Sequence, residues 1–400
     1  MSDDRHISLS PLNRPVDPPA PARVTLNDCT LREAEQGAAV NFTVDGKLAI
    51  ARRLADIGVG QIQIGYPGLT PDDGVVTGTL AAEGLGPRLE VVVLSYLPSW
   101  QEQIQACGTS GGRILHLVYV TSDVRMRDAF GVTRQQALER IRAALRQARP
   151  LFDVVAFTPA DTTRTDHGFL QEVLAVAEEE GADRYYLADS CGAASPVAVR
   201  RLMREMKGMT RKPLGIHAHD DFGLAMANVV AAVEEGAVFV DTVVNGLGDR
   251  TGNPALEEVV AALEFLYGIG TGVDTTRLCE ISQLVADISG APVPFNKALV
   301  GPLAYAHKLE SHVHAVLASP PAFEAMDPRW VGNRRHIALG RYSGPEAVAA
   351  RAREAGVPLE GERLERLMQM VREHAGRKGG LLDDGAFKML LDRVLGLRSA

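Results

Sequence analysis

Short runs of β-branched and apolar residues alternate with longer amphipathic runs along most of the chain. The apolar runs predict eight strands, at residues 24–28, 61–65, 90–96, 114–121, 152–158, 184–189, 214–219 and 239–244. Between them, apolar residues recur at three- and four-residue spacing, which predicts helices. These helical runs include residues 43–57, 134–147, 168–180, 196–207, 224–235 and 254–266. Strand–helix units that fill about 250 residues predict an α/β fold, a (β/α)8 TIM barrel over residues 23–270.

An open, doubly wound sheet is the alternative arrangement of the same units. The chain after its first predicted strand contains neither GxGxxG nor GxxxxGK[ST], which are phosphate-binding motifs of such sheets. The barrel is therefore the favoured interpretation.

The two ends of the chain have a different pattern. Residues 1–22 hold five prolines and few large apolar side chains, which predicts a flexible Pro-rich tail. Residues 271–400 lose the strand alternation and predict a mostly helical C-terminal appendage. Its predicted helices cover residues 275–288, 302–317, 344–355 and 362–397.

The composition narrows the class of protein. The chain has 42 Lys and Arg against 50 Asp and Glu, a formal net charge of −8, which argues against nucleic acid or an anionic membrane as its partner. No stretch reaches the roughly 18 consecutive apolar residues of a membrane span. The 4 cysteines form no CxxC pair, and the N-terminus has no charged-then-apolar signal pattern. We therefore expect a cytoplasmic protein that acts on small-molecule substrates.

Polar side chains gather where barrels carry their catalytic groups, after the carboxyl ends of strands. His217 and His219 are two residues apart on a predicted strand, so both rings point to the same side. Arg32 and Glu33 follow the first strand and add a cation and a carboxylate. Two neutral imidazoles and one carboxylate leave open positions on a divalent metal, as a catalytic site requires. A hydrogen-bonded histidine pair and a solvated Arg–Glu pair are the alternatives.

Three motifs resemble those of the DRE-TIM metallolyases, and more narrowly their acetyl-CoA-dependent branch of homocitrate, isopropylmalate and citramalate synthases. The motifs are DCTLREAEQ at residues 28–36, HAHDDFGLAMAN at 217–228 and NGLGDRTGN at 245–253. AHKLESH at 306–312 and RYSG at 341–344 are similar to segments of homocitrate synthases in particular. The resemblance covers residues 24–395, and it leaves no room for the long regulatory domain of typical isopropylmalate synthases.

The resemblance implies a metal site and a co-substrate. Glu33, His217 and His219 would hold a divalent ion, with Asn253 nearby or ligating, and Zn, Mn, Co and Mg all suit this donor set. The ion would chelate a 2-oxo acid through its keto oxygen and carboxylate, Arg32 would stabilise the developing alkoxide, and acetyl-CoA would be the co-substrate.

Further residues take substrate-binding roles by the same resemblance. Arg127 aligns with the arginine that homocitrate synthases use for the distal carboxylate of 2-oxoglutarate, and a surface arginine is the alternative. Ser190 stands where the family has a carboxylate-binding threonine. Gln36, Tyr96 and the loop arginine Arg164 are the other candidates.

The appendage would contribute His312 as the group that deprotonates the acetyl-CoA methyl, with an exposed histidine as the alternative. Glu310 is a candidate carboxylate partner of that histidine. Three positions depart from the homocitrate synthase pattern: Ala160 replaces an acidic residue, Phe323 a tyrosine and Tyr96 a histidine. These departures predict a changed pocket around an intact metal site.

The sequence therefore predicts a metal-dependent, Claisen-type acyltransferase that joins acetyl-CoA to a 2-oxo acid, with an anionic acceptor such as 2-oxoglutarate favoured. A specialised alkylmalate or phosphonomethylmalate synthase, a retro-aldol lyase of the same superfamily and a regulatory pseudoenzyme are the alternatives. Relatives are commonly homodimers, so we expect a homodimer.

Overall fold

The computed structural model describes residues 5–13, 20–378 and 382–397, which form two compact units. One unit covers residues 12–293, and the other combines residues up to 11 with those from 294 onwards. Within the described residues, no helix combines the length and the apolar character needed to cross a bilayer.

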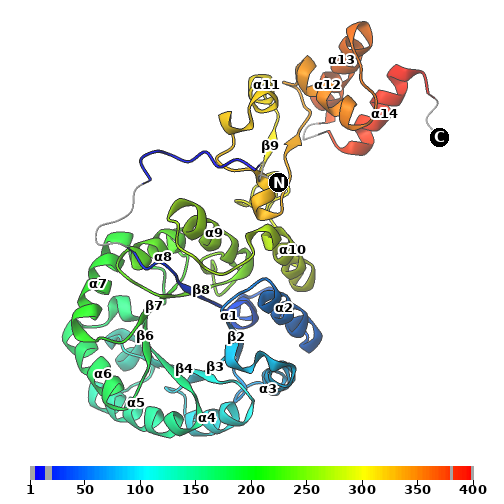
Figure 1. Ribbon diagram of the computed structural model, residues 1–400. Helices are drawn as coiled ribbons and strands as arrows, with labels where there is room; N and C mark the ends of the chain where they lie inside the picture. The colour runs from blue at the N-terminus through cyan, green and yellow to red at the C-terminus, as the bar shows by residue number, and fades with distance from the viewer. Residues whose placement is uncertain (1–4, 14–19, 379–381, 398–400) are drawn as a thin grey trace. The chain divides into compact units, whose positions relative to one another are not determined.

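The larger unit is a closed barrel of parallel strands (Figure 1). Its strands are β1 (Thr25–Asp28), β2 (Gln61–Gly65), β3 (Leu89–Leu94), β4 (Ile114–Val120), β5 (Val154–Ala160), β6 (Arg184–Asp189), β7 (Leu214–Ala218) and β8 (Phe239–Thr242). β1 pairs with both β2 and β8, which closes the ring. The predicted (β/α)8 barrel is confirmed, and each predicted strand lies within two residues of its observed bounds.

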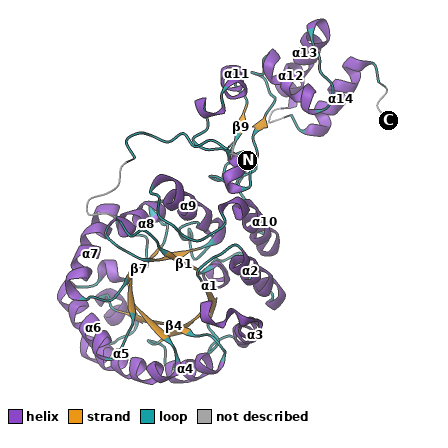
Figure 2. Ribbon diagram, viewed as in Figure 1, coloured by secondary structure: helices purple, strands orange, loops and turns teal. Residues whose placement is uncertain are grey.

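Helices enclose the strands (Figure 2). They are α1 (Thr30–Gln36), α2 (Val44–Asp56), α3 (Pro71–Leu80), α4 (Trp100–Thr109), α5 (Arg134–Ala148), α6 (His167–Glu179), α7 (Pro196–Met209), α8 (Ala225–Glu234) and α9 (Leu256–Ala261). The sequence pattern did not indicate α3, because Gly74 and Gly78 interrupt its apolar stripe. A further helix, α10 (Leu278–Ser289), packs against α2, so the barrel unit continues past the predicted boundary at residue 270.

Polar side chains fill the floor of the barrel, where apolar residues usually dominate. Glu90 of β3 is completely buried and accepts hydrogen bonds from Asn27 at 2.8 Å and from Gln63 at 2.5 Å. Its carboxylate also contacts His116 Nδ1 at 2.9 Å and the Arg184 guanidinium at 2.8 Å. Burial alone would raise the pKa of Glu90, but the charges of His116 and Arg184 outweigh burial and lower it.

The described part of the smaller unit contains two short parallel strands and four α-helices. Strand β9 (Ala306–His307) pairs with β10 (His336–Ile337). The helices are α11 (Glu310–Ala318), α12 (Pro345–Glu354), α13 (Gly361–Lys378) and α14 (Asp384–Leu395), and they enclose an apolar core.

Two predictions for this unit need correction. The predicted helix at 302–317 begins only at Glu310, because the residues before it form turns and the strand pairing of β9. The predicted helix at 362–397 is divided into α13 and α14, and residues 379–381 between them lie outside the described residues.

Part of the predicted N-terminal tail contacts the smaller unit. Ser8 donates a backbone hydrogen bond to Ala325, and Asp327 donates one to His6. The Arg5 guanidinium stacks on the Trp330 ring at 3.6 Å. The prediction of flexibility at residues 1–4 and 14–19 falls outside the described residues.

The buried ion pair on the barrel floor makes a testable stability prediction. We expect Arg184→Met to lower the free energy of unfolding by about 3–5 kcal/mol, because it leaves the Glu90 carboxylate without its fixed cation. Urea denaturation followed by circular dichroism measures the change. The control is Arg113→Met, which removes an exposed pair with Asp153 and should cost less than about 1 kcal/mol. Equal stability of the two variants would show that Glu90 does not need Arg184.

Candidate active site

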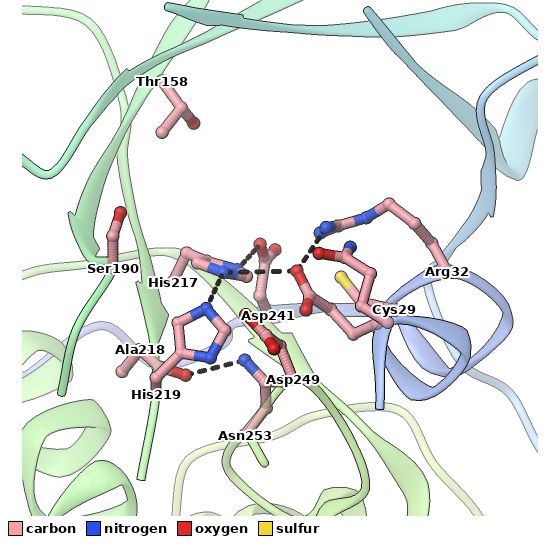
Figure 3. A network of polar contacts seen from close by, with 12 residues as sticks. Cys29, Arg32, Thr158, Ser190, His217, Ala218, His219, Asp241, Asp249 and Asn253 are labelled. Carbon is pink, nitrogen blue, oxygen red and sulfur yellow. Dashed lines mark hydrogen bonds and ion pairs between the residues drawn. The ribbon is translucent and has the colours of Figure 1, made fainter. Parts of the chain in front are cut away.

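A cavity of about 310 Å³ opens at the carboxyl ends of the barrel strands. It lies within the barrel unit and combines polar and apolar walls. The predicted residues that line it are Arg32, Glu33, Gln36, Tyr96, Ser190, His217 and His219. Figure 3 shows Thr158 and Ser190 on the opposite side of the view from Arg32, with the two histidines below.

Glu33, His217 and His219 form a compact group of ligand atoms. One such atom from each residue lies within 4.8 Å of the others. Nε2 of His217 is 3.2 Å from Nε2 of His219 and 3.5 Å from Glu33 Oε1. Two imidazole nitrogens and a carboxylate oxygen that face one another in this way are a donor set for a divalent metal.

The electrostatics of this group favour the ligand forms. Burial, together with the neighbouring His217, lowers the pKa of His219 to about 3, so its ring is neutral and keeps a nitrogen lone pair. Burial would raise the pKa of Glu33, but Arg32 and both histidines lower it, so the carboxylate is ionised. Glu33 Oε2 is buried and has no hydrogen-bond partner among the described residues. The residues therefore fit a divalent metal.

Asp241 of β8 lies behind His217 and was not predicted from the sequence. Its Oδ2 is 2.9 Å from His217 Nδ1, and its Oδ1 accepts a hydrogen bond from Asn27 at 2.9 Å (Figure 3). The carboxylate holds the proton on Nδ1 and leaves Nε2 as the ligand atom. A carboxylate within the otherwise apolar run at the start of β8 was the available signal, since a buried charge needs a partner.

Arg32 is fixed by partners from two elements. Its guanidinium pairs with Glu33 of α1 and donates to Gln63 of β2. It also lies 3.4 Å from the Tyr66 hydroxyl, and Gln36 lies 3.3 Å from the same hydroxyl. Gln63 and Tyr66 line the cavity, and neither was predicted from the sequence.

The loop after β8 brings Asn253 to the end of β7. Gly252 has φ of +94°, and a Cβ there would lie 1.9 Å from the Gly246 carbonyl oxygen, so only glycine fits this turn. Asn253 donates a hydrogen bond to the Ala218 carbonyl at 2.9 Å. Its Oδ1 is buried and without a hydrogen-bond partner in the described chain. Asn253 is therefore anchored at the end of β7, and its amide oxygen remains a candidate for a further ligand atom.

The two predicted substrate-binding arginines are not among the residues that line this cavity. The Arg127 side chain is 76% exposed and pairs with Asp128. Arg125, two residues earlier, lines the cavity in its place. Arg164 forms a double hydrogen bond with Asp161, at 2.8 and 2.7 Å.

The remaining residues of the prediction lie in the smaller unit. The His312 ring stacks on Phe323, with ring centres 4.1 Å apart. The Glu310 carboxylate accepts hydrogen bonds at 2.8 Å from the backbone of Gly344 and of Glu346, at the start of α12. Glu310 therefore caps that helix, a role that accounts for its carboxylate.

Comparison with family models divides the chain in the same way as its fold. Residues 23–285 match the HMGL-like family, and residues 299–379 match the homocitrate synthase post-HMGL domain-like family. The second match lies wholly in the smaller unit.

Comparison with curated proteins finds relatives that extend over nearly the whole chain. Homocitrate synthase AksA of Methanopyrus kandleri is 38% identical over 363 residues, which are 91% of this chain and 90% of the relative. The 2-isopropylmalate synthase of Sulfurisphaera tokodaii is 36% identical over 354 residues, or 88% and 91% of the two chains.

Solved structures share the barrel. The HMG-CoA lyase of Bacillus subtilis superposes with a TM-score of 0.61 at 20% identity, covering 69% of this chain and 97% of the lyase. At that identity the likeness concerns the fold alone. On the two family matches and the full-length relatives, the chain belongs to the HMGL-like family and to the acetyl-CoA-dependent branch of the DRE-TIM metallolyases, and it is an acyltransferase.

Proposed function

We propose that the protein is a metal-dependent synthase that condenses acetyl-CoA with an anionic 2-oxo acid, 2-oxoglutarate first, to give a homocitrate-like product and CoA. The observation that carries this proposal is the group of Glu33, His217 and His219 beside Arg32 in a single cavity. The synthase names of the relatives support the reaction class.

The cavity residues have distinct tasks in this reaction. A divalent ion held by Glu33, His217 and His219 supplies Lewis-acid polarisation of a keto group. Arg32 is fixed by Gln63 and Tyr66, so its positive charge needs no reorganisation when negative charge develops on the keto oxygen.

Carbon–carbon bond formation also needs a proton to leave the acetyl methyl group. We assign this task to His312 on the motif that it shares with homocitrate synthases. The thioester of the condensation product is then hydrolysed, which releases CoA and makes the reaction irreversible.

A retro-aldol lyase of the same superfamily is the second candidate. The two synthase relatives extend over 91% and 88% of this chain, beyond the barrel and into the smaller unit. The match of residues 299–379 to a homocitrate synthase domain also favours a synthase.

The direct test measures CoA release from acetyl-CoA with a thiol reagent. The acceptors are 2-oxoglutarate, oxaloacetate, pyruvate, 2-oxoisovalerate, phenylpyruvate and phosphonopyruvate, each with and without a chelator. We expect chelator-sensitive CoA release with an acceptor that carries a second anionic group. CoA release that the chelator does not change would contradict metal dependence. The absence of CoA release with every acceptor would contradict the proposal of a synthase.

A matched pair of variants locates the activity. His219→Ala should lower kcat/KM by more than about 100-fold, because it removes a ligand atom from the group. His167→Ala is the control, since His167 is exposed on α6 and pairs with Glu205. Full activity of His219→Ala would place the reaction at another site.

Asp241→Asn tests how His217 is held, through metal binding rather than turnover. Whichever way the new amide turns, its NH₂ group meets either the Asn27 donor or the His217 Nδ1 proton. We expect metal affinity to fall about 10- to 100-fold, measured by competition with a coloured chelator. Asp153→Asn, an exposed pair with Arg113, is the control. Unchanged affinity of Asp241→Asn would mean that Asp241 does not orient the ligand.

A further inference from the structure

We infer that Arg125 selects the acceptor, because its guanidinium binds a second anionic group at the far end of the 2-oxo acid. Arg125 takes this role in place of Arg127. The inference rests on the proposed function, and it names the specificity-determining residue of the same cavity. The substrate class is a 2-oxo acid with a short apolar spacer and a terminal carboxylate or phosphonate.

Arg125 differs from the other cavity arginines in its pairing. Within the described chain, the arginines that line the cavity are Arg32, Arg125 and Arg250. Arg32 is paired with Glu33, and Arg250 with Asp221 and Asp249. The Arg125 guanidinium has no hydrogen bond or ion pair to any side chain of the described residues.

The acidic residues of the same loop cannot supply a counter-ion. Asp123 is held by Arg134 through two hydrogen bonds, at 2.9 and 2.6 Å. Asp128 is held by Arg127. A half-buried guanidinium with fixed neighbours and no carboxylate partner is suited to an anion that comes from outside, because its fork matches two oxygens.

The short helical segment that contains Arg125 fixes its position. It belongs to the helical segment Val124–Ala129, which the completely buried side chain of Met126 anchors. Phe130 ends this segment and packs on the Tyr96 ring at 5.1 Å. Burial raises the pKa of Tyr96, and the charges of Arg125 and Arg32 oppose that shift.

The cavity wall gives the shape of the acceptor. Leu94, Val118 and Ala160 line the cavity and offer no charge. The metal-ligand group and Arg125 belong to this one cavity of about 310 Å³. An acceptor with its keto acid at the metal ligands and a few methylene groups along this wall would place its tail charge against Arg125.

The test compares pairs of acceptors that differ in tail charge but have similar shapes. 2-Oxoglutarate is paired with 5-methyl-2-oxohexanoate, and oxaloacetate with 4-methyl-2-oxopentanoate, and phosphonopyruvate is added to separate a phosphonate from a carboxylate. We expect Arg125→Gln to lower kcat/KM for the preferred anionic acceptor about 10- to 100-fold, mainly through KM, because a charged hydrogen bond is lost. Its kcat/KM for the partner acceptor with the uncharged tail should change less than about threefold.

Arg127→Gln is the matched comparison, since Arg127 is in the same segment but is exposed and paired. We expect it to keep the wild-type preference. Three results would overturn the inference. They are loss of the preference for a charged tail in Arg127→Gln alone, an equal fall of kcat/KM for both acceptors of a pair in Arg125→Gln, or a wild-type enzyme that prefers the acceptor with the uncharged tail.

Equilibrium binding separates this inference from the reaction itself. The same acceptors are titrated by calorimetry into the metal-loaded protein without acetyl-CoA. An anionic acceptor that binds the wild type and is weakened about 10- to 100-fold in Arg125→Gln supports the inference even if no CoA is released. Equal affinity for the two proteins, or no binding of any anionic acceptor to the wild type, overturns it.

Discussion

A charge removed from water inside the barrel has to be paired, and this requirement organises the interior of the larger unit. Glu90 is the centre of the arrangement, with Arg184 on one side and Asn27 on the other. Asn27 also donates to Asp241, and Asp241 contacts His217. An apolar floor would leave the His217 ring without this support, so the barrel floor and the metal-ligand group form one connected structure.

The need to pair a buried charge also explains why two arginines of the cavity, Arg32 and Arg125, differ in their partners. Arg32 lies deep beside β1 and β2, where its charge is held by Glu33 and by polar groups of β2. Arg125 is only half-buried, so water can solvate it until an anion replaces that water. A fully buried guanidinium without a carboxylate would destabilise the fold, whereas a half-buried one costs little and remains available to a ligand.

The sequence predicts the parts of this arrangement that depend on neighbouring residues. Strand alternation revealed the barrel, and the two-residue spacing of His217 and His219 placed both rings on one face. Glu90 and Arg184 were not recognised, because their contact joins residues 94 positions apart, and nothing near either of them indicates the pairing. Arg127 was predicted from the family resemblance, and nothing in the sequence indicates which residues of this short helical segment face the cavity. In the structure Arg127 is exposed beside Asp128, whereas Arg125 lines the cavity.

These contacts explain why an uncharged residue, Ala160, is suited to a position where the homocitrate synthase pattern has an acidic one. A glutamate at this position would add a negative charge to the cavity that Arg125 lines, and would compete with an acceptor for its guanidinium. Ala160 adds no charge, and the neighbouring Asp161 is held by Arg164 and Ser122. The missing acidic side chain therefore belongs to one electrostatic arrangement with Arg125, whose guanidinium has no side-chain partner among the described residues. It suits an acceptor that brings its own second negative charge.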